Sequence, residues 1–215
     1  MKKLLETILP QAFIDSYKIY RNRHSEGIIK KWEAKGKPLP PPHAIKQRAI
    51  QYYQKRSGYR LLVETGTYKG DMILAQKDFF KKIYSIELSQ PLFERAKKRF
   101  RKYPYVTLLQ GNSGDVIANV LTELKEPAIF WLDGHYSGGI TATIDKYSPI
   151  NEELALLIAH NQWQHVILID DARVFTGEHG YPTIEEVRQV TAKQLPGYRF
   201  SVEEDIIRLV PEKFS

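Results

Sequence analysis

From residue 60 onward, short apolar runs alternate with longer amphipathic segments, and this alternation limits the possible folds more than any other feature. The apolar runs lie at 61–64, 83–87, 106–109, 129–133 and 166–170. Amphipathic segments near 71–80, 90–102, 114–125 and 150–160 lie between them. Strands that are apolar along their whole length are typical of parallel sheets with both faces covered by helices. The sequence therefore predicts a doubly wound α/β domain.

The last part of the chain departs from this rhythm. A helical pattern at 183–194 precedes two strand-like runs, 198–203 and 206–210, with only Glu204 and Asp205 between them. Two strands joined so closely form a β-hairpin. We therefore expect the mostly parallel sheet to end in an antiparallel pair.

Residues 1–57 differ in charge from the rest of the chain. They hold 13 Lys and Arg against 4 Asp and Glu, while the whole chain of 215 residues has a net charge of +7. Helical spacing at 4–20 and 44–56 flanks a stiff, proline-rich stretch at 37–42. We interpret 1–57 as a helical N-terminal extension for substrate or oligomer contacts, and 58–215 as the main domain. The basic excess indicates an anionic partner or, alternatively, a solvated helical face.

Cysteine usage and hydropathy restrict the class of protein. The chain has no cysteine, which excludes a disulfide framework, thiolate metal sites and cysteine nucleophiles. Glu6 and Pro10 interrupt the N-terminal apolar run, and no later stretch approaches the length of a membrane span. We therefore expect a cytoplasmic protein without a membrane span. A homodimer is a separate possibility that the sequence leaves open.

The first apolar run leads into a glycine-bearing turn. Glu64, Thr65, Gly66, Tyr68 and Gly70 lie between this run and the next helical segment. Glycines let backbone amides approach a ligand closely, and the start of a helix offers unpaired N–H groups. The Gly-x-Gly-x-x-Gly spacing of dinucleotide sites is absent. The turn therefore predicts a different ligand site, with a purely structural strand–helix turn as the alternative.

Polar residues also follow the second and third runs. Glu87 stands 23 residues after Glu64, where Rossmann-like sites place an acid that accepts hydrogen bonds from ribose hydroxyls. A solvated carboxylate at the strand end is the alternative reading. After the third run, Asn112, Ser113 and Asp115 either contact an adenine edge or cap the following helix.

Three aspartates follow the fourth and fifth runs: Asp133, Asp170 and Asp171. Ligands of open parallel sheets bind outside the carboxyl ends of the strands, so these carboxylates should converge. Close carboxylates repel one another unless one is protonated or a cation binds. Oxygen ligands favour Mg²⁺, Ca²⁺ or Mn²⁺. We therefore expect a metal site; alternatively, one aspartate caps a helix and the others are solvated.

These residues occur in an order and at spacings that resemble the class I S-adenosylmethionine (SAM)-dependent methyltransferases. Within this class, the chain is similar to the cation-dependent O-methyltransferases of the catechol type and of the macrocin type, which methylate sugars. The resemblance covers roughly residues 60–210. The matching segments are Glu64-x-Gly66-x-Tyr68-x-Gly70, Ser85-Ile86-Glu87, Gly111-x-Ser113-x-Asp115, Leu132-Asp133 and Ile169-Asp170-Asp171.

The resemblance implies a seven-stranded Rossmann-like sheet and a defined set of ligand contacts. It places Glu64, Gly66 and Gly70 around the methionine moiety of SAM, Glu87 on the ribose and Ser113 near the adenine. The cofactor residues expected from pattern and resemblance together are Glu64, Thr65, Gly66, Tyr68, Gly70, Glu87, Asn112, Ser113, Asp115 and Asp133. The expected ligands of a divalent cation, Mg²⁺ first, are Asp133, Asp170 and Asp171.

The expected activity is cation-assisted O-methylation of a small hydroxylated acceptor, such as a sugar, a phenol or a natural product. The catechol group has a lysine as general base three residues after its first metal aspartate, and this chain has Tyr136 there. In addition to Asp133, we therefore name His135 and His179 as catalytic candidates, because the ordinary histidine pKa suits proton abstraction near neutral pH. Alternative functions are a nucleic-acid methyltransferase that uses the basic N-terminal region and a non-catalytic binding protein of the same fold.

Overall fold

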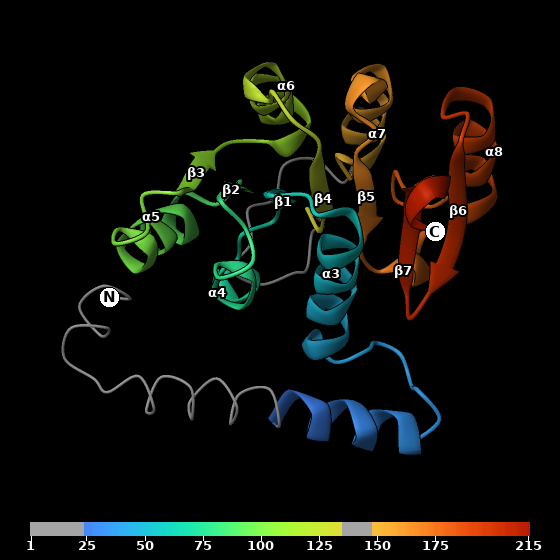
Figure 1. The fold of residues 1–215 in the computed structure, drawn as a ribbon, viewed down its shortest axis with the longest axis horizontal. Coiled ribbons are helices and arrows are strands. Elements are labelled where there is room, and N and C mark those ends of the chain that lie inside the picture. Colours follow the sequence, from blue (N-terminus) through green and yellow to red (C-terminus); the bar gives the residue numbers. More distant parts are fainter. Residues whose placement is uncertain (1–23, 135–147) are drawn as a thin grey trace.

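The computed structural model describes residues 24–134 and 148–215, and its centre is a seven-stranded sheet. The spatial order is β3-β2-β1-β4-β5-β7-β6 (Figure 1). Strands β1 to β5 pair in parallel, and β7 pairs antiparallel with β5 and β6. This confirms the predicted sheet and its antiparallel C-terminal hairpin. The strands are β1 (Leu61–Thr65), β2 (Lys82–Glu87), β3 (Val106–Gln110), β4 (Ala128–Leu132), β5 (Val166–Ile169), β6 (Tyr198–Glu203) and β7 (Ile206–Pro211).

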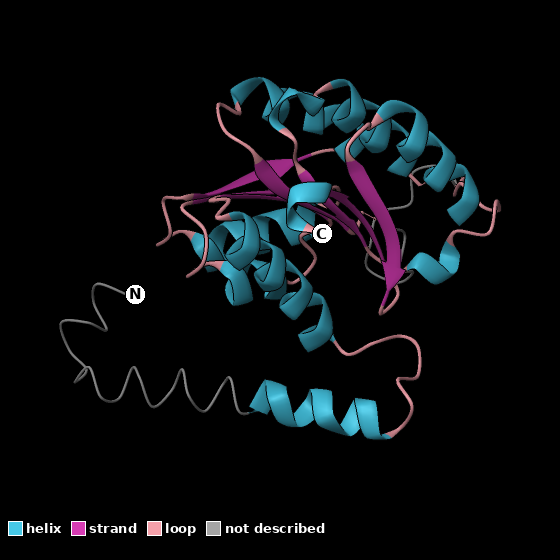
Figure 2. Ribbon diagram, turned by 45° about the vertical axis from the view of Figure 1, so that its right-hand side comes forward, coloured by secondary structure: helices cyan, strands magenta, loops and turns pink. Residues whose placement is uncertain are grey.

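Helices cover both faces of the sheet, as the doubly wound prediction required (Figure 2). One face carries α3 (His43–Ser57), α4 (Asp71–Gln76) and α5 (Gln90–Phe100). The other carries α6 (Ser113–Glu123), α7 (Ile150–Ala159) and α8 (Ile184–Gln194). Short 3₁₀ turns are η1 (Asn161–Trp163), η2 (Ala172–Val174) and η3 (Glu212–Phe214). Within the described residues, no helix combines the length and apolarity needed to cross a bilayer.

The central strands are apolar throughout because each of their faces meets a different layer of helices. Successive side chains of a strand point to opposite faces. In β1, Leu61 and Val63 belong to the core under α6, α7 and α8, whereas Leu62 belongs to the core under α3, α4 and α5. All five residues of β1 and of β4 are buried. The two cores therefore share the central strands.

Helix α3 joins the part of the chain before residue 58 to the sheet. Ile50 and Tyr53 pack in the core between α3 and the sheet. Residues 24–34 are helical, and Trp32 packs against the start of α3 at Ile45. The division expected between residues 57 and 58 stays a prediction, although α3 itself shares the core of the main domain. The helical stripe predicted at 4–20 lies outside the described residues.

The carboxyl ends of the central strands meet at one edge of the sheet. Thr65 at the end of β1 pairs with Ile86 of β2 and with Leu132 of β4, and Leu132 pairs with Ile169 of β5. The residues that follow these strands are therefore neighbours in space. This edge is where the sequence places its candidate site.

Candidate active site

The turn after β1 is wedged tightly between β2 and β4. Gly66 has a φ of 80°, and its N–H donates to the carbonyl of Ile86 at 2.9 Å. A Cβ at Gly66 would lie 2.2 Å from the carbonyl oxygen of Asp133. Gly70 also has a positive φ, and a Cβ there would lie 2.4 Å from the ring of Phe100. Both glycines are therefore required by close packing at positive φ.

Glu64, near the end of β1, is a buried acid. Its side chain is 1% exposed, and its Oε1 accepts a hydrogen bond from Ser85 Oγ at 2.6 Å. Its Oε2 has no hydrogen-bond partner among the described residues. Burial raises the pKa of the Glu64 carboxyl to about 8, although the bond from Ser85 opposes this. A buried acceptor without a partner is costly, so this oxygen is suited to a cationic or hydrogen-bond-donating ligand.

Glu87, at the end of β2, holds the same turn from the other side. Its Oε2 accepts from the backbone N–H of Tyr68 at 2.7 Å, and its Oε1 accepts from that of Ser89 at 2.8 Å. Burial raises the pKa of Glu87, while these two amides favour the ionised form. Each carboxylate oxygen has a second lone pair, so Glu87 can hold the turn and still accept from a ligand hydroxyl.

After β3, the three predicted residues separate into different environments. Asn112 caps α6, its side chain accepting from the N–H of Gly114 at 3.1 Å, as the capping alternative predicted. Ser113 is buried, and its Oγ lies 3.2 Å from where a Cβ of Gly134 would stand. Asp115 is exposed in the first turn of α6. The structure therefore brings Ser113, but not Asp115, to the buried side of the site.

Sequence reasoning missed Glu153, a fully buried acid that α7 brings to this group. Its Oε1 has no hydrogen-bond partner among the described residues, and the hydroxyls of Ser113 and Thr65 lie beside the carboxyl. Burial raises its pKa to about 7. The sequence held a signal, because Glu153 interrupts the apolar stripe that contains Ile150 and Leu157 at helical spacing.

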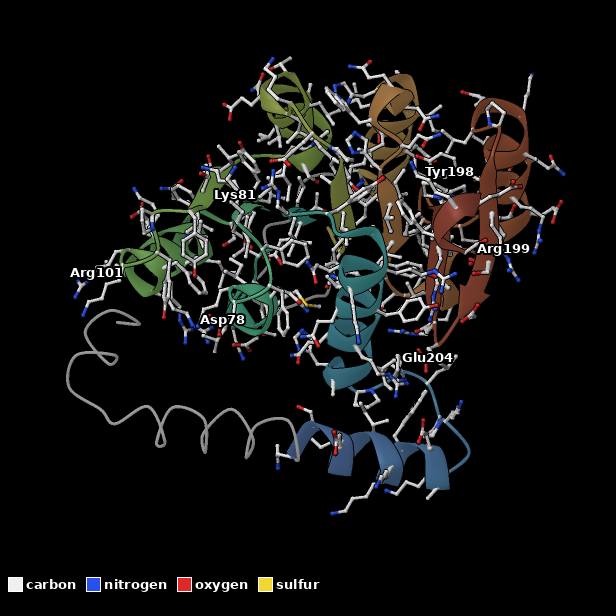
Figure 3. The ribbon with its side chains drawn as sticks, viewed as in Figure 1. Asp78, Lys81, Arg101, Tyr198, Arg199 and Glu204 are labelled. Carbon is white, nitrogen blue, oxygen red and sulfur yellow. The ribbon has the colours of Figure 1, made fainter. Side chains whose placement is uncertain are left out.

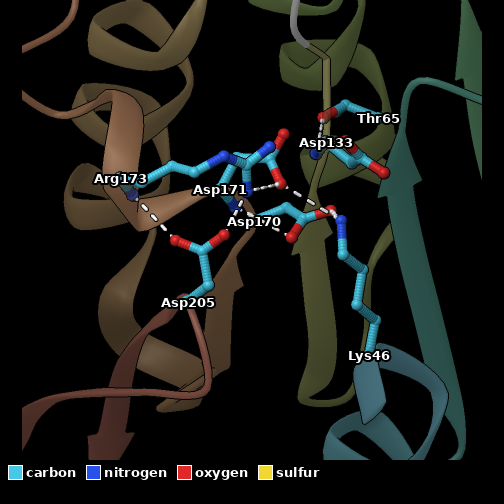
Figure 4. A network of polar contacts seen from close by, with 7 residues as sticks. All are labelled: Lys46, Thr65, Asp133, Asp170, Asp171, Arg173 and Asp205. Carbon is cyan, nitrogen blue, oxygen red and sulfur yellow. Dashed lines mark hydrogen bonds and ion pairs between the residues drawn. The ribbon is translucent and has the colours of Figure 1, made fainter. Parts of the chain in front are cut away.

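The three aspartates converge as predicted (Figure 4). The backbone N–H of Asp133 donates to Thr65 Oγ1 at 3.1 Å, and that of Asp170 donates to the carbonyl of Leu132 at 2.9 Å. Asp170 is fully buried, and Asp171 has a φ of 54°. Burial and the charge of Asp133 raise the pKa of Asp170 well above its ordinary value. These acids therefore form one electrostatic group that favours a positive charge.

The structure supplies a positive charge that sequence reasoning missed. Lys46, in the first turns of α3, places its Nζ 2.5 Å from Asp170 Oδ2 and 3.1 Å from Asp171 Oδ1. Arg173 approaches from the other side, with its guanidinium 2.9 Å from the same oxygen of Asp171 and also paired with Asp205. Figure 4 shows the lysine rising from α3 toward the two carboxylates. No local pattern marks Lys46, which stands 124 residues from Asp170 in the chain.

The aspartates are already engaged by positively charged side chains where a divalent cation was expected. The nearest oxygens of Asp170 and Asp171 already accept from the Lys46 ammonium. Asp171 Oδ1 accepts from Arg173 as well. Over residues 24–134 and 148–215, no group of three or more His, Asp or Glu side chains is placed to hold a metal ion. In this arrangement the donor set does not fit a divalent cation.

Only one of the two histidine candidates, His179, lies within the residues that the structure describes. His135, like Tyr136, lies outside the described residues. His179 is exposed on the loop after β5 with a φ of 54°. The general base therefore stays a prediction for both.

A separate cavity of about 420 Å³ lies between α3 and the β6–β7 hairpin. Arg48 in its wall pairs with Glu204 at 2.8 Å, and Arg208 pairs with Glu203 at 2.9 Å. Figure 3 shows Arg199 on β6 and Glu204 at the hairpin turn. None of the described candidate site residues lines this cavity, so we assign the chemistry to the carboxylate group instead.

Replacing Glu64 by glutamine is expected to stabilise the ligand-free protein, and more strongly at higher pH. The pKa of Glu64 is about 8 in the folded chain against an ordinary value of 4.5. A raised carboxyl pKa contributes stability that is fully present below 4.5 and is lost as the pH rises through 8. Glutamine carries no such proton, so its advantage should grow by up to about 1.4 kcal/mol per pH unit across this window. Thermal unfolding of both proteins from pH 6 to pH 9 measures the difference, and a constant difference would contradict the assignment.

No protein-family model and no curated protein matches the sequence. Among solved structures, the O-methyltransferase from Bacillus cereus in complex with S-adenosylhomocysteine (SAH) is 13% identical with a TM-score of 0.59, and the match covers 97% of this chain and 96% of that one. The fold is the Rossmann-like methyltransferase fold.

Two further structures show the same likeness. The O-methyltransferase TomG from Streptomyces achromogenes, in complex with SAM, is 13% identical with a TM-score of 0.58 over 86% of this chain and 88% of its own. The SAH-bound methyltransferase PaMTH1 from Podospora anserina is 14% identical with a TM-score of 0.54 over 94% and 97%. These matches cover 86% or more of each chain, so the likeness extends over most of the fold.

Proposed function

We propose that this chain is a SAM-dependent methyltransferase that methylates an oxygen of a small hydroxylated acceptor. The observation that carries the proposal is Glu64, a buried acid beside the Gly66 turn with one oxygen that has no hydrogen-bond partner in the part of the chain that the structure describes. The methyltransferase fold supports it, as do the complexes of similar structures with SAH and SAM. When bound, SAM supplies an electrophilic methyl group.

The buried carboxyls fit a ligand that carries positive charge next to a ribose. SAM has a sulfonium and an α-ammonium group, which restore the ionised state of acids that burial keeps protonated. Glu64 and Glu153 are such acids, with pKa values of about 8 and about 7. Glu87 holds the turn through two amides and keeps lone pairs for the ribose hydroxyls. Thr65, Tyr68, Gly70, Asn112 and Ser113 keep their proposed places around this frame, whereas Asp115 is exposed in the first turn of α6, away from its buried side.

We propose that the acceptor binds with its reacting oxygen next to Asp133. Asp133 follows β4, and the backbone at its carbonyl touches the Gly66 turn. His135 and His179 remain the proposed bases. Assistance by a divalent cation stays an alternative, in which the ion must displace Lys46 from Asp170 and Asp171. The acceptor is a sugar, a phenol or a natural product.

A methyl-transfer assay tests the activity. The protein is incubated with SAM labelled in the methyl group and with a panel of sugars, phenols and polyketides, and SAH is quantified. We expect acceptor-dependent SAH formation, lowered about a hundredfold in Asp133→Asn. Asp78→Asn is the control, because Asp78 lies between α4 and β2, away from the carboxyl ends of the strands (Figure 3).

The rival functions give different results in the same experiments. Turnover with RNA or DNA alone, together with salt-sensitive gel-shift binding, would support the nucleic-acid alternative. SAH binding without turnover on any acceptor would support a non-catalytic binding protein. Either result would contradict the proposed acceptor class.

A further inference from the structure

Lys46 stands where the sequence led us to expect a divalent cation. Its ammonium contacts Asp170 Oδ2 at 2.5 Å and Asp171 Oδ1 at 3.1 Å. Its charge also acts on Asp133, the third aspartate of the group. The positive charge of one lysine from α3 therefore acts on all three carboxylates that follow β4 and β5.

The surrounding structure fixes the lysine in this place. Its neighbour Ile45 is fully buried and packs with Trp32, and Ile50, one turn later, is fully buried against the sheet. The Lys46 side chain is only 14% exposed, and Asp170 is fully buried. A long lysine side chain loses rotamer freedom when it is held in this way, so the contact depends on the anchoring of α3.

A divalent cation and the Lys46 ammonium compete for the same oxygen of Asp170. Mg²⁺ binds carboxylate oxygen at about 2.0–2.1 Å, and the ammonium already lies 2.5 Å from Asp170 Oδ2. On the fully buried Asp170 Oδ2, a doubly charged ion and the ammonium would lie within about 4 Å of each other and repel strongly. Arg173 adds a further positive charge on Asp171. Metal binding therefore requires Lys46 to leave.

We propose that Lys46 takes the place of the divalent cation, neutralising Asp170 and Asp171 and holding the acceptor oxygen with its remaining N–H. An ammonium has three donors, and two of them are used on the aspartates among the described residues. A fixed positive charge at the acceptor oxygen stabilises the negative charge that develops there as its proton leaves. The acceptor part of this inference rests on the proposed function, whereas the replacement of the cation does not.

Manganese binding tests the replacement directly, because Mn²⁺ gives an electron paramagnetic resonance signal when free and loses it when bound. The proteins compared are the wild type, Lys46→Met, Lys46→Arg and the control Lys55→Met, in which an exposed lysine of the same helix is changed. We expect the wild type, Lys46→Arg and Lys55→Met to bind Mn²⁺ only weakly. Lys46→Met opens the carboxylates and should bind it at least about tenfold more tightly.

Two outcomes overturn the replacement. One is tight Mn²⁺ binding by the wild type that is lost in Asp170→Asn, since the ion then displaces Lys46. The other is a Lys46→Met protein that unfolds cooperatively but gains no Mn²⁺ affinity. If Lys46→Met does not fold, the wild type and Lys46→Arg still decide, because weak binding by both supports the replacement and tight binding by either overturns it.

SAH calorimetry and EDTA separate this inference from the proposed function. Lys46→Met is expected to keep its SAH affinity within about twofold, because the lysine contacts the acceptor side of the site. EDTA should leave wild-type methyl transfer unchanged. Lys46→Met should raise the KM for the acceptor, and Lys46→Arg should bring this KM back toward the wild-type value. Loss of wild-type activity in EDTA, restored by Mg²⁺, would overturn the inference and leave the methyltransferase proposal intact. Absence of SAH binding by the wild type would overturn the proposed function and leave the Mn²⁺ result standing.

Discussion

Replacing Gly66 by alanine is expected to abolish SAH binding and to lower the free energy of unfolding by about 3 kcal/mol or more. The φ of 80° is unfavourable for alanine, and the new Cβ would lie 2.2 Å from the carbonyl oxygen of Asp133 and 2.9 Å from its carbonyl carbon. These are backbone atoms at the end of a buried central strand, so they cannot move aside cheaply. The turn or the end of β4 must shift, and both form the proposed cofactor site.

Gly197 provides a matched control for this substitution. It also has a φ of 80°, but a Cβ there would meet no atom within 4 Å. Gly197→Ala should therefore carry only the conformational cost, about 1–2 kcal/mol, and keep its SAH affinity. Thermal or denaturant unfolding and SAH calorimetry on both variants measure the effects. Equal losses of stability in the two variants, with SAH binding retained in both, would show that the close approach of the turn to Asp133 has no consequence.

The second large effect is expected from Glu64→Gln, which should weaken SAM binding about 10-fold to 100-fold while leaving the fold intact. Hydrogen bonds to charged groups contribute about 1.5–3 kcal/mol, and glutamine keeps the shape of the side chain without its charge. Oε2 of Glu64 has no partner among the described residues, so we propose that the positive part of SAM is its partner. The same substitution should stabilise the ligand-free protein, which is the usual relation between a buried charged site and stability.

A control for Glu64→Gln lies on α6. Glu123 accepts a hydrogen bond from the Tyr84 hydroxyl at 3.1 Å and stands at the end of that helix, away from the turn. Glu123→Gln should leave the SAM dissociation constant unchanged. Calorimetry with SAM at pH 8 compares the three proteins. An unchanged affinity in Glu64→Gln would remove Glu64 from the cofactor site.

Most of the fold followed from the sequence because few topologies satisfy its pattern. Continuous apolar runs require a sheet covered on both faces, and the short link at Glu204 and Asp205 allows only a hairpin. The ends of parallel strands then bring Glu64, Asp133 and Asp170 to one edge, and the pairing of β1 with β4 and of β4 with β5 confirms this.

Lys46 could not be found in this way because its place depends on tertiary packing. Which side of α3 faces the aspartates follows from how Ile45 and Ile50 are buried, and neither their spacing nor the charge of the helix indicates a partner 124 residues away. Glu153 was different, since an acid inside the apolar stripe of a predicted helix is a visible conflict between pattern and residue type. Such conflicts mark places where the chain keeps a costly group for a ligand.

Calorimetric titration of the folded wild-type protein with SAH decides whether the carboxyl edge of this sheet binds the methyl donor. We expect one site per chain with a dissociation constant in the micromolar range. Proton uptake or release on binding should differ between pH 6.5 and pH 8.5, since the pKa values of Glu64 and Glu153 are about 8 and about 7. A folded protein that shows no heat with SAH or SAM, and no rise in its melting temperature with either, would contradict the proposed cofactor site.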